Sequence, residues 1–323
     1  MTRAILVRAH GGPEVLTLET VAVGAPGPGE IRVKNHAIGI NFVDTYQRSG
    51  LYPVPLPFVA GNEGMGTITA LGPEVTGFHL GQRVAYQGPV GAYADERLLP
   101  AARVVPVPDS IADETAAAAL LKGTTAWYLL HETHRIKPGD TVLIHAAAGG
   151  TGHLLVQWAK ALGARVIGTA GGPEKVALGR AAGADLMIDY RAGGFVDAVR
   201  AATNGRGVDV VYDGVGQSTF EGSLDCLRPR GLMVSFGNAS GPVSIPRLMV
   251  LAEKGSLYLT RPTSAAYLGT PEALRTAAAA LFAAIASGTL SVPIGHRYPL
   301  EAAAEAHRGL EARETTGAGV LLV

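Results

Sequence analysis

The residues best suited to chemistry lie in a glycine-rich turn near the middle of the chain. An apolar run at 142–144 leads into this turn, and a segment with helical spacing follows it. Glycines let a ligand approach the backbone closely, and the N–H groups and dipole at a helix start attract an anion. The pattern Ala-x-x-Gly-Gly-x-Gly therefore predicts a nucleotide phosphate site at Ala148, Gly149, Gly150, Thr151 and Gly152. A purely structural glycine turn is the alternative.

The end of the next predicted strand indicates which nucleotide would bind. In sites for NAD an acidic residue, about 20 residues past the first glycine, accepts hydrogen bonds from the ribose. Here that place reads Thr169-Ala-Gly-Gly172, without a carboxylate, which permits the extra phosphate of NADP. Lys175 and Tyr190 are candidates to bind that phosphate, although each has a plain structural alternative, and Glu174 would oppose it if it pointed inward. We predict NADPH as the cofactor.

Composition and charge exclude several classes of protein. The chain has 323 residues, of which 47% are hydrophobic, and its 27 basic residues balance its 27 acidic ones. This size favours two domains, and the charge balance argues against nucleic-acid binding or membrane-surface binding by bulk charge. No apolar run approaches the roughly 20 residues that span a bilayer, and no signal segment begins the chain. With Cys226 as the single cysteine, we expect a soluble cytoplasmic protein without disulfides.

The order of predicted elements indicates how these residues are positioned. Up to about residue 120, short strands such as 31–34, 66–71 and 83–86 alternate with Gly/Pro turns, which is typical of an antiparallel β domain. Strands and helices then alternate, which predicts a doubly wound parallel sheet. We expect strands at 141–146, 164–169, 186–188, 208–212 and 231–236, and helices at 151–162, 173–182, 194–202 and 217–227. The final pieces, helices 271–287 and 301–312 and strand 319–323, resemble the first domain. We therefore expect the parallel-sheet domain, 125–263, to be inserted into a catalytic domain of 1–124 and 264–323.

Several motifs in both halves of the chain carry a family resemblance. The glycine turn is flanked by Gly139, Asp140, Leu143, Gln157 and Lys160, and the other motifs are Gly39–Tyr52, Ala60–Gly64, Lys122–Ala126, Ser235–Asn238 and Thr260–Pro262. With these motifs the chain resembles the zinc-independent NADPH:quinone oxidoreductases, the zeta-crystallin-like branch of the medium-chain dehydrogenase/reductase superfamily. The resemblance implies an α/β protein with a GroES-like β-rich catalytic domain and a doubly wound, parallel-sheet Rossmann domain.

The same resemblance implies roles for individual residues. Asn41 and Tyr46 would lie beside the nicotinamide and its ribose, and Thr125 would reach a phosphate or ribose. The turn 148–152 would bind the pyrophosphate, and Lys175 and Tyr190 would bind the adenosine phosphate. Phe236 and Asn238 would form the wall near the nicotinamide. Thr169, at the end of the second strand, would contact the cofactor. We expect the catalytic group to be Asn41, Tyr46 and Tyr52, with Tyr52 at the edge of the substrate pocket unless its Pro-rich loop is only a rigid turn.

The chemistry is expected to need no metal. Where zinc-dependent relatives have their first ligand this chain has Asp44, and their Gly-His-Glu segment reads Gly61-Asn62-Glu63. Asn is a poor zinc ligand, and no cysteine cluster can form. Without a Lewis acid the substrate must accept hydride readily, as a quinone does, while the protein supplies orientation. Tyr46 or a water molecule would then supply the proton.

Three alternatives remain open at this point. One-electron transfer to the quinone is also chemically possible. The enzyme could instead reduce 2-alkenals or enones with NADPH, or the chain could bind NADPH without catalysis. By analogy we expect a homodimer formed through the edge strand at 256–260, with no nucleic-acid partner and no membrane insertion.

Overall fold

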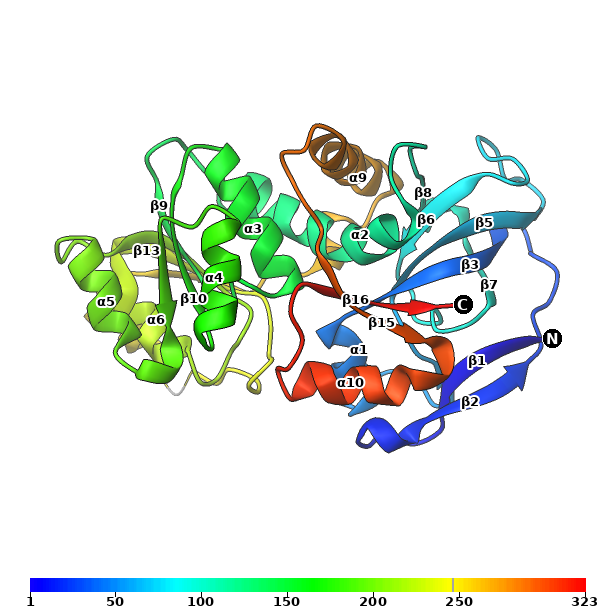
Figure 1. The fold of residues 1–323 in the computed structure, drawn as a ribbon, viewed down its shortest axis with the longest axis horizontal. Helices are drawn as coiled ribbons and strands as arrows, with labels where there is room; N and C mark the ends of the chain where they lie inside the picture. The colour runs from blue at the N-terminus through cyan, green and yellow to red at the C-terminus, as the bar shows by residue number, and fades with distance from the viewer. Residues whose placement is uncertain (246) are drawn as a thin grey trace. The chain divides into compact units, whose positions relative to one another are not determined.

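The computed structural model describes residues 1–245 and 247–323, which form two compact units (Figure 1). The first unit comprises Met1–Thr124, Thr270–Gly288 and Val292–Val323, and the second comprises Thr125–Gly269 and Thr289–Ser291. The second unit thus interrupts the chain of the first. Residues 264–269, which we expected in the first unit, cluster with the second. Part of the reason is that the ring of Tyr267 stacks on that of Tyr128, with the centroids 4.8 Å apart.

The first unit is built mainly on antiparallel strands, and only β15 and β16 among its described strand pairs run parallel. Its larger sheet has the order β15-β16-β3-β5-β6-β8, with β7 also paired to β3, and its smaller sheet has the order β2-β1-β4. Along the first half of β3 burial alternates, as expected where one face covers a core. The strands are β1 (Thr2–Val7), β2 (Leu16–Val21), β3 (Glu30–Ile40), β4 (Phe58–Val59), β5 (Glu63–Leu71), β6 (Arg83–Gln87), β7 (Glu96–Pro100), β8 (Val104–Pro106), β15 (Ile294–Pro299) and β16 (Ala318–Leu322).

Four helices complete this unit or lead out of it. They are α1 (Phe42–Arg48), α2 (Asp113–Tyr128), α9 (Pro271–Ala286) and α10 (Ala303–Glu311). The last strand, β16, pairs antiparallel with β3, so the end of the chain completes a sheet begun by residues near its start. The core includes Ile31, Val33, Ile38, Tyr93 and Leu321. Because of this pairing, α10 lies in the same compact unit as α1, and the two helices share a buried network at the candidate site.

The second unit is a parallel sheet with the order β11-β10-β9-β12-β13-β14. Its inner strands are buried along almost their whole length, because helices cover both faces of such sheets. The strands are β9 (Thr141–Ile144), β10 (Arg165–Ala170), β11 (Leu186–Asp189), β12 (Val208–Asp213), β13 (Leu227–Ser235) and β14 (Tyr258–Thr260). The helices are α3 (Gly150–Ala161), α4 (Pro173–Ala181), α5 (Phe195–Ala202), α6 (Phe220–Cys226), α7 (Met249–Glu253) and α8 (Ser264–Tyr267).

The main departure from the predicted elements lies between β12 and α6. The sequence predicts a helix at 217–227, but α6 begins only at Phe220. The Asp213 carboxylate accepts the N–H groups of Val215 and Gly216, and Gly216 has φ +95°, so these residues form a tight loop instead. Within the described ranges, no helix combines the length and apolar character needed to cross a membrane.

Candidate functional site

The glycine-rich turn between β9 and α3 is shaped by contacts that exclude larger side chains. A Cβ on Gly152 would lie 2.1 Å from the carbonyl oxygen of Ala146, so only glycine lets the helix approach the turn this closely. Ala146 itself has φ +51°, and the N–H of Ala147 bonds to the carbonyl of Thr169, 3.0 Å away in β10. Gly149 precedes the helix and supplies no side-chain cap. The first N–H groups of α3 lack partners within the helix, so this turn suits a phosphate.

Thr169 lies at this turn, but its side chain is directed into the core of the unit. It is 1% exposed, and its hydroxyl lies 2.8 Å from Nδ1 of His145. Nε2 of His145 lies 2.9 Å from the Ser223 hydroxyl, which donates to the carboxylate of Asp213 at 2.9 Å. Burial lowers the pKa of His145, although the charge of Asp213 opposes this effect. The hydroxyl of Thr169 is therefore engaged in this buried network.

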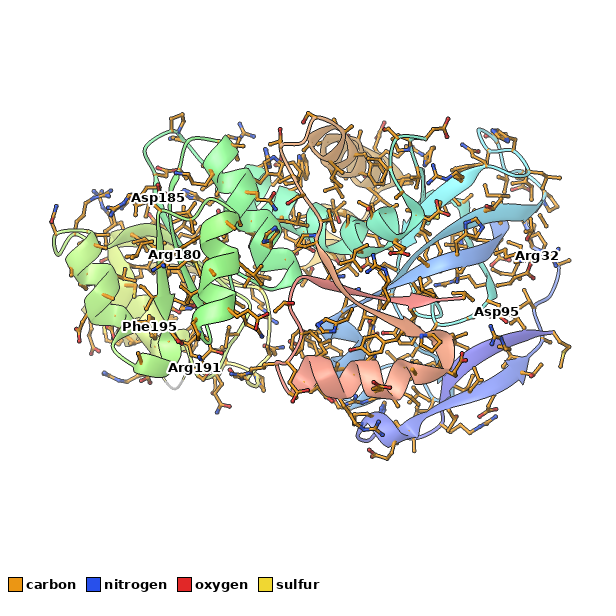
Figure 2. All side chains as sticks on the ribbon, viewed as in Figure 1. Arg32, Asp95, Arg180, Asp185, Arg191 and Phe195 are labelled. Carbon is orange, nitrogen blue, oxygen red and sulfur yellow. The ribbon has the colours of Figure 1, made fainter. Side chains whose placement is uncertain are left out.

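The turn after β10 is covered by two side chains that follow β11. A Cβ on Gly171 would lie 2.6 Å from the phenolic oxygen of Tyr190, and a Cβ on Gly172 would lie 2.3 Å from the Arg191 guanidinium. The side chain of Arg191, which follows β11 in the chain, is labelled in Figure 2. The carboxylate of Asp189 accepts the N–H groups of Gly172 and Arg191 at 3.0 Å, and these donors lower its pKa. Two groups that bind phosphate oxygens thus lie against one glycine pair.

The start of α4 adds a third candidate for the same role. Lys175 is half-buried on the first turn of this helix, whereas Glu174 is exposed. Lys175 and Tyr190 were predicted from the sequence for this role, whereas Arg191 was not. The signal was available, because Arg191 directly follows Tyr190 and an arginine near this strand end accommodates the 2′-phosphate in NADP sites.

The loops after β12 and β13 meet at the carboxyl ends of the parallel strands. A Cβ on Gly237 would lie 2.2 Å from the carbonyl oxygen of Gly214, and the ring of Phe236 packs over Gly214. Arg261, just after β14, donates to the Ser235 hydroxyl at 3.2 Å and to the Gly237 carbonyl at 3.0 Å. Phe236 and Asn238 are both half-buried here. Ligands of doubly wound sheets bind at this edge.

In the first unit, α1 and the turn that follows it hold the three residues expected in catalysis. Asn41 immediately precedes α1, and its backbone N–H donates to the carboxylate of Asp44 at 2.8 Å, which fixes the start of the helix. Tyr46 is 9% exposed, and its ring meets that of Tyr52 edge-on, with the centroids 5.2 Å apart. The backbone N–H of Tyr52 bonds to the carbonyl of Tyr46. The structure therefore brings Tyr46 and Tyr52 into contact, with Asn41 just before the helix that carries Tyr46, while Thr125 lies half-buried on α2 in the second unit.

A buried ion pair lies beside Asn41. The carboxylate of Glu63, at the start of β5, is 0% exposed and meets the ammonium group of Lys122 at 2.8 Å. The same oxygen accepts the side-chain N–H of Asn41 at 2.7 Å, and the second oxygen accepts the backbone N–H of Leu121 at 2.7 Å. From the sequence, Glu63 was identified as the last residue of the segment that binds zinc in relatives, where hydrogen bonds that fix a loop were expected of it.

A second buried network connects α1 to α10. Nη1 of Arg48 lies 3.1 Å from Nδ1 of His307, whose Nε2 lies 3.1 Å from the hydroxyl of Tyr93. That hydroxyl donates to Asp44 at 3.0 Å, and Asn62 donates to the other oxygen of Asp44 at 2.6 Å. Since Arg48 can only donate, His307 is neutral with its proton on Nε2. Burial, and then the nearby charge of Arg48, lower the pKa of His307 to about 3.

The positions that correspond to zinc ligands are occupied by this hydrogen-bonded network. Asp44 accepts three hydrogen bonds, and Asn62 also bonds to Gln47. Cys226 is buried in α6, and its pKa is raised to about 12 by that burial. In the part of the chain that the structure describes, no group of three or more His, Cys, Asp or Glu residues is arranged to hold a metal ion.

Comparison with known proteins places the chain in a family. The "Alcohol dehydrogenase GroES-like domain" family matches residues 27–109, and the "Zinc-binding dehydrogenase" family matches residues 150–282. A quinone oxidoreductase of Pseudomonas aeruginosa is 51% identical and covers 100% of both chains. A 2-haloacrylate reductase of Burkholderia sp is 45% identical, covering 100% of this chain and 99% of its own. The crystal structure of Escherichia coli quinone oxidoreductase complexed with NADPH has a TM-score of 0.98 and 47% identity, covering 99% of this chain and 100% of that one. The chain belongs to the quinone oxidoreductase family of the medium-chain dehydrogenase/reductase superfamily.

Proposed function

We propose that this protein reduces quinones with NADPH by direct hydride transfer and without a metal. The observation that carries the proposal is the turn between β9 and α3, where Gly152 leaves no room for a Cβ and the first N–H groups of the helix lack partners within it. The full-length likeness to quinone oxidoreductases, one of them complexed with NADPH, supports the same conclusion. Bound NADPH supplies the hydride, and the protein orients the two reactants.

The residues of the second unit fit NADPH better than NADH. The β10 end carries two glycines instead of a carboxylate, and the side chains of Tyr190 and Arg191 lie against them. Lys175 on α4 adds a further cation, while Glu174 is exposed rather than buried in the turn. Arginine and lysine both bind phosphate through charge-assisted hydrogen bonds. We propose that these three residues bind the 2′-phosphate.

The residues of the first unit would serve the reacting end. Asn41 and Tyr46 would contact the nicotinamide half of the cofactor, and Tyr52 would border the acceptor. Tyr46 or a water molecule would donate the proton that the reduced oxygen requires. The ring of Tyr46 contacts that of Tyr52, so its phenol would lie near the acceptor that Tyr52 borders. A Tyr46→Phe variant tests this role. A fall in kcat with an unchanged KM for NADPH supports Tyr46 as the donor, and full turnover assigns the proton to water.

We also propose that zinc has no part in the reaction, although one matched family is described as zinc-binding. The support is the donor set: Asp44 already accepts three hydrogen bonds and Glu63 pairs with Lys122, so both carboxylates have other partners. Asn62 supplies an amide where zinc sites use histidine or cysteine. A quinone needs no Lewis acid, because its electron-poor conjugated ring already accepts hydride readily.

A second candidate is the reduction of electron-poor alkenes, and the 2-haloacrylate reductase with 45% identity favours it. A panel of quinones, 2-alkenals and enones, compared by kcat/KM with NADPH, separates the two. A preference for quinones supports the first proposal, and a preference for alkenes supports the second. Tight NADPH binding without oxidation by any acceptor would leave only a cofactor-binding role.

We propose further that the protein forms a homodimer in the cytoplasm. β14 is the edge strand of the parallel sheet, and Tyr258 on it is 62% exposed. Near it in sequence, Leu248 and Met249 are 72% and 59% exposed, which is unusual for large apolar side chains. Light scattering of the wild type and of Tyr258→Asp tests this proposal. A wild-type dimer that the substitution weakens supports it, and a wild-type monomer refutes it.

A further inference from the structure

The Glu63–Lys122 ion pair is more deeply buried than an ion pair used only for stability needs to be. Its two side chains are 0% and 7% exposed, and the charged atoms lie 2.8 Å apart. Removing two charges from water costs so much that apolar residues of similar volume are often at least as stabilising. The pair therefore calls for a role beyond stability, and its neighbours indicate one.

The neighbour of interest is the side-chain amide of Asn41. Its nitrogen lies 2.7 Å from Oε1 of Glu63 and 3.4 Å from the carbonyl oxygen of Gly39. An amide nitrogen carries two protons, so both are directed at these acceptors. Gly39 is required here, because a Cβ would lie 2.3 Å from Oε1 of Glu63. The arrangement of three residues thus turns the nitrogen of Asn41 inward.

We propose that Glu63 is a positioning residue that makes Asn41 a hydrogen-bond acceptor toward the bound ligand. With both N–H groups taken, Asn41 can offer a ligand only the second lone pair of its oxygen, which also caps the Asp44 N–H at the start of α1. It accepts a hydrogen bond from a hydroxyl or amide N–H of the cofactor's nicotinamide half, and it does not stabilise negative charge on a substrate oxygen. Lys122 balances the charge of Glu63, and the Leu121 N–H fixes the second carboxylate oxygen. This inference rests on the proposed NADPH-dependent function.

A polarity swap tests the inference. Glu63→Gln combined with Lys122→Met places an amide nitrogen where Asn41 needs an acceptor, because the Leu121 N–H then holds the amide oxygen and no lysine competes for it. Asn41→Asp instead places two carboxylates face to face. We expect the paired variant and Asn41→Asp each to raise the KM for NADPH about tenfold or more, which corresponds to one hydrogen bond of about 1.4 kcal/mol. In the triple variant the new amide at position 63 donates to the new carboxylate at position 41, whose other oxygen accepts from the ligand. We expect its KM to return to within about threefold of wild type.

The controls separate positioning from folding and from the proposed function. Glu114→Gln is a matched change on α2, where Glu114 pairs with Arg297 at an exposed site, and it should leave KM unchanged. Near-UV circular dichroism identifies the folded variants, and Asn41→Ala provides a second cycle in which Glu63→Gln with Lys122→Met should add no further loss. A folded triple variant no better than the paired variant or Asn41→Asp alone would overturn the inference, because an aspartate at position 41 can serve the ligand only as an acceptor. Failure of the wild type to oxidise NADPH would instead remove the proposed function.

Discussion

Replacing His307 with glutamine should reverse how acid affects the stability of the first unit. In the folded protein His307 is neutral, and its pKa of about 3 compares with ~6.5 in an unfolded chain. In the unfolded state His307 therefore binds a proton below pH ~6.5, whereas in the folded state it binds that proton only near pH 3. Between pH 7 and pH 5 this difference costs the folded state about 2 kcal/mol. Glutamine keeps a donor and an acceptor but never takes that charge.

Asp44 acts in the opposite direction over the same pH range. Burial raises its pKa to about 6, against ~3.9 when unfolded, and the donors Asn62, Asn41 and Tyr93 only partly offset this effect. The folded state thus binds a proton near pH 6 that the unfolded state binds only near pH ~4. Acidification from pH 7 to pH 5 should therefore stabilise the folded state by about 1 kcal/mol through Asp44, and this stabilisation is lost as the pH rises through 6.

The assay is urea unfolding at pH 7 and pH 5, compared between variants so that all other titrating groups cancel. From these two residues the wild type should lose about 1 kcal/mol on acidification. On the same acidification, the unfolding free energy of His307→Gln should change by about 2 kcal/mol in the stabilising direction relative to that of wild type. The unfolding free energy of Asp44→Asn should fall by about 1 kcal/mol more than that of wild type. Identical pH dependence in all three proteins would refute the assignment of neutral His307 and protonatable Asp44.

The remaining predictions concern the nucleotide site. Gly152→Ala places a Cβ 2.1 Å from the Ala146 carbonyl, so it should cost about 1–3 kcal/mol of unfolding free energy and weaken NADPH binding. Gly149→Ala, with 3.3 Å of clearance, should cost less, and equal losses in urea melts would contradict the steric reason. Arg191→Ala should raise the KM for NADPH about tenfold and leave that for NADH nearly unchanged, because only the former carries the 2′-phosphate. Steady-state kinetics with both cofactors measure this ratio, and parallel changes would exclude the role.

The sequence was sufficient for the elements of the parallel sheet, because buried apolar strands and amphipathic helices leave distinct periodicities. It also located the turn at Gly152, where the structure adds a second reason for glycine, the close approach of α3 to the Ala146 carbonyl. The direction of the Thr169 side chain was not predictable, since a strand's pleat and its neighbours decide which face a residue occupies. Asp44 was identified from the sequence as the residue in place of a zinc ligand and was expected to form hydrogen bonds, but its partners were not predictable. Its contact with Tyr93, and through it with His307, joins residues more than 200 positions apart and has no local signal.

The distant contacts within the first unit also explain why the inward amide of Asn41 was missed. Its orientation depends on Glu63 and Lys122, which come from β5 and α2 and carry charges usually found on surfaces. A single sequence shows that these residues exist, but not that they meet. Arg191 could have been identified from its place directly after Tyr190, and the structure adds its position over Gly172.

The most direct test of the central claim is the oxidation of NADPH at 340 nm after the protein has been dialysed against a strong chelator. With 1,4-benzoquinone as acceptor, we predict that kcat/KM is unchanged by chelation, is not raised by added Zn²⁺, and is much greater with NADPH than with NADH. Loss of turnover on chelation with recovery by Zn²⁺ would contradict the metal-free mechanism. Absence of NADPH oxidation with every quinone tested would contradict the proposed function itself.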